Sequence, residues 1–238
     1  MKCDPEQGNA RRTSKRQTMS QGRVLIAAAI AAGALYVVGF IALGSPPGAS
    51  EHPLRVLGWF RDHRNAARLY AWTATFGTLA FAVMAGIIRG MLPAPSRDVF
   101  LLGASAFIAE TAVQAWFWAG IALHPLALRP VVARLLLDVA SYWGPLLTGA
   151  TTAMIGAVTV LGLGARPQIP RWLTVIGAIA FLEQAVETLT VFGRHGFIAP
   201  GGGMNVVLGA ACTAVWIGAL VVWSYRRLGA APAAQPVT

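Results

Sequence analysis

Charged residues are scarce in this chain of 238 residues. Only 12% of its residues are charged and 56% are hydrophobic, with a mean hydropathy of +0.59. About a quarter of the residues in an ordinary soluble domain carry charge, so this composition excludes a soluble domain of the usual kind. It predicts an integral membrane protein whose partner is the lipid bilayer.

Cysteine and histidine are also rare, and their positions exclude several kinds of site. Cys3 lies in a polar segment and Cys212 in an apolar run, so we expect no disulfide between them. The four histidines lie in or beside predicted loops, which excludes a haem held across the membrane. The spacings Glu-x-x-His of di-iron bundles and His-Glu-x-x-His of zinc proteases do not occur. We therefore predict no cofactor and no metal.

Acidic residues are outnumbered by basic ones, with nine against 19 and a net charge of +10. Such an excess suggests nucleic-acid binding in a soluble protein, but no RNA-binding motif, zinc-ligand spacing or basic helix with interleaved aromatics is present. We expect no nucleic-acid partner. Arginine outnumbers lysine 17 to 2, which indicates a GC-rich genome rather than a function.

Long apolar runs are what the chain has in abundance. Each bilayer crossing needs about 20 such residues, and six runs qualify, with proline- and glycine-rich breakers between most of them. The runs cover residues 24–43, 69–88, 99–123, 135–163, 172–192 and 204–223. The predicted fold class is all-α, a polytopic bundle of six transmembrane helices in residues 24–227. Residues 1–23 are expected to form a disordered basic tail and residues 228–238 a disordered C-terminal tail.

The distribution of lysine and arginine predicts the orientation, because cytoplasmic segments retain positive charge. With the N-terminus inside, the inner segments hold twelve of these residues and the outer segments seven. This favours both termini in the cytoplasm and a multi-pass protein of the bacterial cytoplasmic membrane. The first apolar run is longer than the roughly 7 to 15 residues of a signal-peptide core, so we interpret it as an uncleaved span.

Four acidic residues lie in or near the predicted spans, namely Glu110, Asp138, Glu183 and Glu187. A charged carboxylate at the bilayer centre costs at least about 2.5 to 3.5 kcal/mol, so we expect these residues to face the interior of the bundle. Glu183 and Glu187 are one helical turn apart, and two carboxylates that close in a low dielectric cannot easily both ionise. The sequence therefore predicts a buried, protonated acid, and these four residues are the candidate catalytic groups.

Five polar or aromatic residues of the predicted spans are the candidate binding residues, and Gln114, Trp118 and Tyr142 among them lie at helical spacing from an acid. The five are Gln114, Trp116, Trp118, Tyr142 and Asn205. Together with the acids they predict a polar cavity in the outer half of the bundle, in which the aromatic rings offer cation–π contacts. The alternatives stay open: Gln114 as an interhelical hydrogen-bond partner, the tryptophans as interface anchors, and Arg134 with Asp138 as an ion pair.

Two short segments add weaker signals. The sequences "ETAVQ" from Glu110 and "EQAVE" from Glu183 echo each other in spans that run in the same direction, which is either an internal repeat or chance. The segment "APGGGMN", which ends at Asn205, precedes the sixth run and is adequately explained as a turn.

As a whole the chain resembles the uncharacterised six-span membrane proteins of GC-rich bacteria, a resemblance that carries no activity. In its size, and in having acids buried near aromatic residues, it is also similar in kind to the small integral-membrane terpene cyclases. That similarity implies an isomerase-type enzyme in which a carboxylic acid protonates a lipophilic, isoprenoid-like small molecule and starts its cyclisation or isomerisation. Glu183 or Glu187 would donate the proton, while Glu110 and Asp138 would stabilise the developing cation.

Two other classes of function use the same acids. A proton-coupled transporter of a small solute would expose them alternately to the two sides of the membrane, although the inner half offers few polar residues for a path. An accessory membrane subunit would pair them with arginines of a partner. The sequence leaves the oligomeric state open.

Overall fold

The computed structural model describes residues 5–230, with the side chains of residues 19–142 and 147–230. Within these ranges the chain is helical and contains no β-strand. The α-helices are α1 (Pro5–Leu43), α2 (Pro53–Asp62), α3 (Arg64–Arg89), α4 (Ser96–Leu123), α5 (Pro130–Ser141), α6 (Trp143–Thr159), α7 (Arg171–Glu187) and α8 (Ala210–Ala230). The shorter turns are the 3-10 helices η1 (Val160–Gly162), η2 (Thr188–Phe192) and η3 (Gly196–Ile198) and the π-helix η4 (Met204–Gly209).

Five of the described helical segments are long and apolar enough to cross a bilayer. They are Met19–Leu43, Arg64–Arg89, Ser96–Leu123, Arg171–Phe192 and Met204–Ala230. Each corresponds to one of the runs that the sequence predicts, so the protein is an all-helical membrane protein.

The fourth predicted run, residues 135–163, is not one helix. It is divided at Tyr142 into α5 and α6, and its long apolar part is the shorter helix Leu147–Gly162. The physical reason lies in Pro145, which has no N–H to donate to the carbonyl of Ser141.

The N-terminal segment also differs from the expected disordered tail. Helix α1 begins at Pro5, a residue suited to the first position of a helix because its missing N–H is not needed there. No further proline interrupts the chain before the apolar run, so one helix includes both. At the other end α8 continues to Ala230, and the rest of the predicted C-terminal tail lies outside the described residues.

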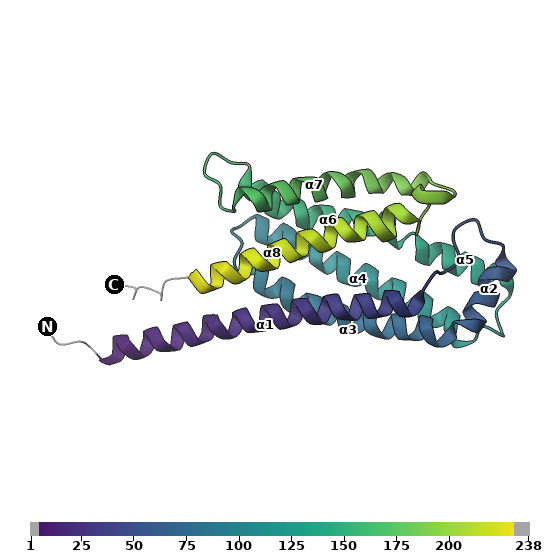
Figure 1. Ribbon diagram of the computed structural model, residues 1–238, viewed down its shortest axis with the longest axis horizontal. Helices are drawn as coiled ribbons and strands as arrows, with labels where there is room; N and C mark the ends of the chain where they lie inside the picture. The colour runs from purple at the N-terminus through teal and green to yellow at the C-terminus, as the bar shows by residue number, and fades with distance from the viewer. Residues whose placement is uncertain (1–4, 231–238) are drawn as a thin grey trace.

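The long helices form a closed ring. Contacts run in sequence from α1 to α3, α4, α6, α7 and α8, and α8 returns to α1. Figure 1 shows these helices side by side along the long axis of the molecule. The start of α1 and the end of α8 lie at one end, and α2 and α5 lie at the opposite end.

The α2 and α5 end has a hydrophobic core of its own. Val56, Leu57 and Phe60 of α2 are buried against Trp118 of α4 and Leu137 of α5. Each such side chain contributes about 1.5 to 3 kcal/mol when it is fully buried. The segment between the first two apolar runs is therefore a packed cap on this end of the ring.

Candidate functional site

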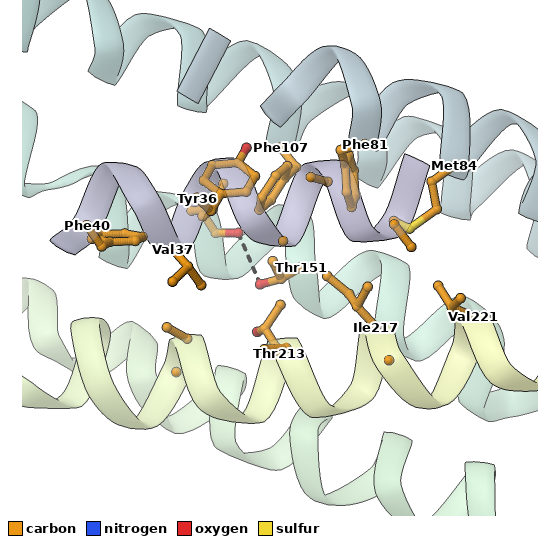
Figure 2. Close-up of a pocket in the computed structure, with 18 of the residues that line it drawn as sticks. Tyr36, Val37, Phe40, Phe81, Met84, Phe107, Thr151, Thr213, Ile217 and Val221 are labelled. Atoms are coloured by element: carbon orange, nitrogen blue, oxygen red, sulfur yellow. Dashed lines mark hydrogen bonds between the residues drawn. The ribbon is translucent and has the colours of Figure 1, made fainter. Parts of the chain in front are cut away.

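A long cavity lies inside the helix ring. It has a volume of about 510 Å³, and Figure 2 shows the side chains that enter it from several helices. Most of its wall is aromatic or aliphatic and includes Tyr36, Phe40, Phe81, Met84 and Phe107. A wall of this kind suits an apolar molecule of small-molecule size.

Polar side chains meet on one stretch of the cavity wall. Glu187 is 4% exposed, and Gln184 and Asn205 beside it are 3% and 4% exposed. Asn205 Nδ2 donates to Glu187 Oε1 over 2.6 Å, and Gln184 Nε2 donates to Glu187 Oε2 over 2.6 Å. Each oxygen of this buried carboxyl group thus accepts from one amide. We call Gln184, Glu187 and Asn205 the amide–acid cluster.

The other partners of the two amides decide which way round each amide lies. The backbone N–H of Gly201 can only donate, and it donates to Asn205 Oδ1 over 3.1 Å. The NH₂ group of Asn205 therefore faces Glu187. The NH₂ group of Gln184 donates to Glu183 Oε2 as well as to Glu187 Oε2, and its Oε1 accepts the hydroxyl hydrogen of Thr151 on α6.

Local departures from the α-helix bring these residues together. Helix α7 changes to η2 directly after Glu187, and Thr190 of η2 donates to the Glu187 carbonyl over 2.7 Å. Asn205 lies in the π-helical η4, a geometry that is frequent at functional sites. Gly201 has φ of +70°, which glycine adopts without strain. The glycine segment is therefore a turn, as predicted, and it also supplies the donor to Asn205.

No cation lies against the amide–acid cluster. In residues 19–142 and 147–230 the ion pairs join Arg55 to Glu51, Arg89 and Arg97 to Asp98, and Arg134 to Asp138. None of them includes Glu187. A charged carboxylate is costly to bury without a cation, so the two amides are the groups that stabilise negative charge on Glu187.

Glu183 contacts the amide–acid cluster, whereas Glu110 of α4 has no hydrogen bond with it among the described residues. Glu183 Oε2 accepts from Gln184 Nε2 over 2.8 Å, while its Oε1 is buried and has no hydrogen-bond partner. Glu110 has one buried oxygen, Oε2, that also has no partner. Neither side chain belongs to the cavity wall. Of the two predicted neighbours on α7, Glu187 is the one that faces the cavity.

Asp138 lies outside the cavity and belongs to an ion pair. Arg134 Nε donates to Asp138 Oδ2 over 3.0 Å, and the same guanidinium donates to three backbone carbonyls of the loop before α2. These carbonyls belong to Gly48, Ala49 and Glu51. The prediction of Asp138 as a member of the acidic site is therefore corrected, and the ion-pair alternative describes its position.

The predicted binding residues other than Asn205 also lie away from the cavity wall. Gln114 Oε1 accepts the hydroxyl hydrogen of Tyr70 over 2.7 Å, which is the interhelical role that the sequence left open. Trp118 is packed in the core at the α2 end, and Trp116 is 70% exposed. Tyr142 marks the division between α5 and α6.

Several residues of the cavity wall were not among the predicted ones. Gln184 carried a usable signal, since it lies three residues before Glu187 and so shares its helix face. Thr151 was missed because residues 135–163 were expected to form one continuous helix, whereas α6 begins at Trp143. The aromatic wall consists of tyrosines and phenylalanines of α1, α3 and α4, and nothing in the spacing of the acids pointed to them.

Comparison with known proteins adds no relative to this description. No protein-family model, curated protein or solved structure matches the chain.

Proposed function

We propose that this membrane protein carries out acid–base chemistry on a lipophilic, isoprenoid-like molecule, with Glu187 as the acid. The observation that supports the proposal is a largely apolar cavity whose wall contains one buried carboxyl group held by two amides. An acid in such surroundings reaches an apolar substrate without competing water. The reaction class is cyclisation or isomerisation.

The proposed chemistry needs no further reactant. The carboxyl proton of Glu187 adds to an alkene carbon, whose π electrons form the new C–H bond and leave a carbocation. A second double bond can then close a ring through a new C–C bond. Loss of a neighbouring proton to the Glu187 carboxylate restores an alkene, so the product is an isomer of the substrate.

The residues around Glu187 fit each stage of this scheme. The amide N–H groups of Gln184 and Asn205 stabilise the carboxylate that forms when the proton leaves. The rings of Tyr36, Phe81 and Phe107 in the cavity wall can face the carbocation, because an aromatic face attracts a cation. The sequence assigned these cation–π contacts to Trp116, Trp118 and Tyr142, and we now assign them to the rings of the cavity wall.

The test replaces Glu187 by glutamine, which keeps the size of a protonated glutamate but cannot give up an acidic proton. Wild type equilibrated in D₂O is mixed with geraniol, farnesol or geranylgeraniol, and the products are separated and weighed by mass spectrometry. We expect an isomer that carries one deuteron. Glu187→Gln should lower its rate by about 10²- to 10⁴-fold, the usual contribution of a general acid.

Glu110→Gln is the matched control for this test, because Glu110 is an intramembrane glutamate outside the cavity wall. It should convert the alcohols at the wild-type rate. Equal rates for wild type and Glu187→Gln, or no deuterium in any product of the folded wild-type protein, would contradict the proposed chemistry.

We also propose six crossings with both termini in the cytoplasm. Helix α6 and η1 connect the end of the ring where α5 lies to the end where α7 begins (Figure 1), which supports a crossing by this shorter apolar helix. The excess of lysine and arginine on the side of the termini supports the orientation. We place the protein in the bacterial cytoplasmic membrane on the same grounds.

A further inference from the structure

The cavity is long and narrow rather than round. Along the last helical segment its wall extends from Gly209, beside Glu187, to Val221, twelve residues further on. This corresponds to about 18 Å at ~1.5 Å per residue. A volume of about 510 Å³ spread over such a length leaves a slender channel. The shape suits one extended hydrocarbon chain better than a compact ring system.

The two ends of this channel differ in polarity. Near Gly209 the wall includes the amide–acid cluster and Thr151. Toward Val221 the side chains are mainly apolar, and Figure 2 shows Ile217 and Val221 of α8 on the same side of the space as Thr213, with Phe81 and Met84 across from them. An occupant that matches both ends has one hydrogen-bonding head and one apolar chain.

The channel reaches the surface between α1 and α8. Ile30 and Val37 of α1 belong to its wall, yet they are 66% and 56% exposed. The two helices come together near their cytoplasmic ends, where a Cβ added to Gly22 would lie 3.3 Å from the ring of Tyr225. The opening therefore faces the side of the bundle, where the solvent is lipid.

We infer that the cavity is the binding site of a single-chain lipid, a linear prenyl or acyl amphiphile that enters from the bilayer between α1 and α8. Its hydroxyl head lies at the amide–acid cluster, where the oxygens of Glu187 and of the two amides can accept its hydrogen bond, and its chain follows α8 toward Val221. This inference rests on the proposed function and names its class of substrate. It concerns binding, which is measured separately from conversion.

Gly218 provides a direct test of where the chain lies. It belongs to the cavity wall about nine residues beyond Gly209, and a Cβ added there meets nothing within 4 Å. Gly218→Leu should therefore fold, while its side chain fills the far part of the channel. Gly86→Leu is the matched control, since Gly86 is an exposed glycine of α3 outside the cavity wall and also has nothing within 4 Å.

The protein is placed in nanodiscs of dioleoylphosphatidylcholine with an equimolar mixture of geraniol, farnesol, geranylgeraniol and oleyl alcohol. After washing, the retained alcohols are quantified by mass spectrometry against empty nanodiscs. We expect wild type and Gly86→Leu to retain geranylgeraniol best among the prenyl alcohols. Gly218→Leu should retain at least about tenfold less of it, a loss typical of misfit in an apolar pocket, and should keep geraniol.

Each outcome of this experiment bears on the inference. Preference for geranylgeraniol over oleyl alcohol assigns the site to prenyl chains, and equal retention assigns it to linear chains in general. Wild type that retains no alcohol above empty nanodiscs, or a Gly218→Leu profile equal to that of wild type, overturns the inference. Retention without conversion overturns only the proposed chemistry. If Gly218→Leu does not melt like wild type, Gly33→Leu replaces it, because Gly33 also lines the cavity with nothing within 4 Å.

Discussion

At the scale of single residues, the position of one carboxyl group decides what the cavity can do. Glu187 is buried and accepts hydrogen bonds from two amides whose orientations are determined by other partners. Donors of this kind, aimed in advance at a developing charge, cost no reorganisation when the charge appears. Glu183, one turn away, lacks this support on its Oε1 atom. The two glutamates therefore differ in their hydrogen-bond partners. Their spacing along the helix does not predict this difference.

Gly209 is the residue that lets the last helical segment approach this acid. A Cβ added there would overlap the carboxylate of Glu187. We predict that Gly209→Ala lowers the free energy of unfolding by about 1 to 3 kcal/mol, the usual cost of overpacking, and also lowers conversion by displacing the acid. Thermal unfolding in detergent and the deuterium assay measure the two effects.

Gly218→Ala is the control for that change, because its Cβ meets nothing within 4 Å. In a helix this replacement should leave stability unchanged or raise it by up to about 1 kcal/mol, since alanine loses less backbone freedom than glycine. Equal melting of the two alanine variants would mean that α8 can move away from Glu187 without cost, contrary to the prediction.

Some residues of the candidate site could be predicted from the sequence and others could not. Intramembrane acids are expensive, so Glu187 was identifiable, and Asn205 was identifiable from its place after the glycine turn. The tyrosines and phenylalanines of the cavity wall were not, because an aromatic residue in an apolar helix has the same pattern whether it faces a cavity, a core or lipid. Tyr36 lines the cavity and Trp116 is exposed. This difference becomes visible only when the helices are packed into the ring.

At the scale of elements, the sequence predicts apolar helices well and their rotations poorly. The runs at 24–43, 69–88 and 99–123 correspond to single helices, because length and apolar composition alone define them. The run at 135–163 was expected to be one helix, but the chain is divided at Tyr142, and a division changes which residues share a face. Within the unbroken helix α7 the spacing is reliable, and Gln184 and Glu187, three residues apart, both line the cavity.

One side chain of helix α5, that of Arg134, ties the helix to the loop before α2. The guanidinium of Arg134 bonds to Asp138 and to three loop carbonyls. We predict that Arg134→Lys lowers the free energy of unfolding by about 1 to 3 kcal/mol. The ammonium group of lysine cannot reach all the acceptors that the planar guanidinium of arginine bonds, so some loop carbonyls lose their donor. Faster proteolysis of residues 44–52 should accompany the lower melting temperature, while conversion by Glu187 stays unchanged.

Arg55→Lys is the matched control, because Arg55 pairs with Glu51 at the same spacing but its side chain is 74% exposed. Exposed ion pairs of this kind contribute about 0 to 1 kcal/mol, so this variant should melt close to wild type. If Arg134→Lys melts no lower than Arg55→Lys, the contact between α5 and the loop is not what holds this end of the ring.

At the scale of the whole molecule, the ring and the topology depend on each other. Helices α1 and α8 are in contact and close the ring. They run in opposite directions (Figure 1), as they do when the chain ends on the side of the membrane on which it began. Five described segments are long and apolar enough to cross by themselves, and an odd number of crossings would leave the termini on opposite sides. The start of α1 and the end of α8 lie at the same end in Figure 1, which supports the proposal that α6 supplies a sixth crossing.

The length of that segment is sufficient for a crossing. Helix α6 has 17 residues and η1 has 3, which together span roughly 30 Å at ~1.5 Å and ~2.0 Å per residue, close to the ~30 Å hydrocarbon core. We therefore predict that reporter fusions after Arg97, after Gln168 and at the C-terminus read cytoplasmic, and that a fusion at Asp62 reads external. A fusion at Asp62 is the internal control, because its position does not depend on α6. An external C-terminus together with an external Asp62 would mean that α6 does not cross, contrary to the prediction.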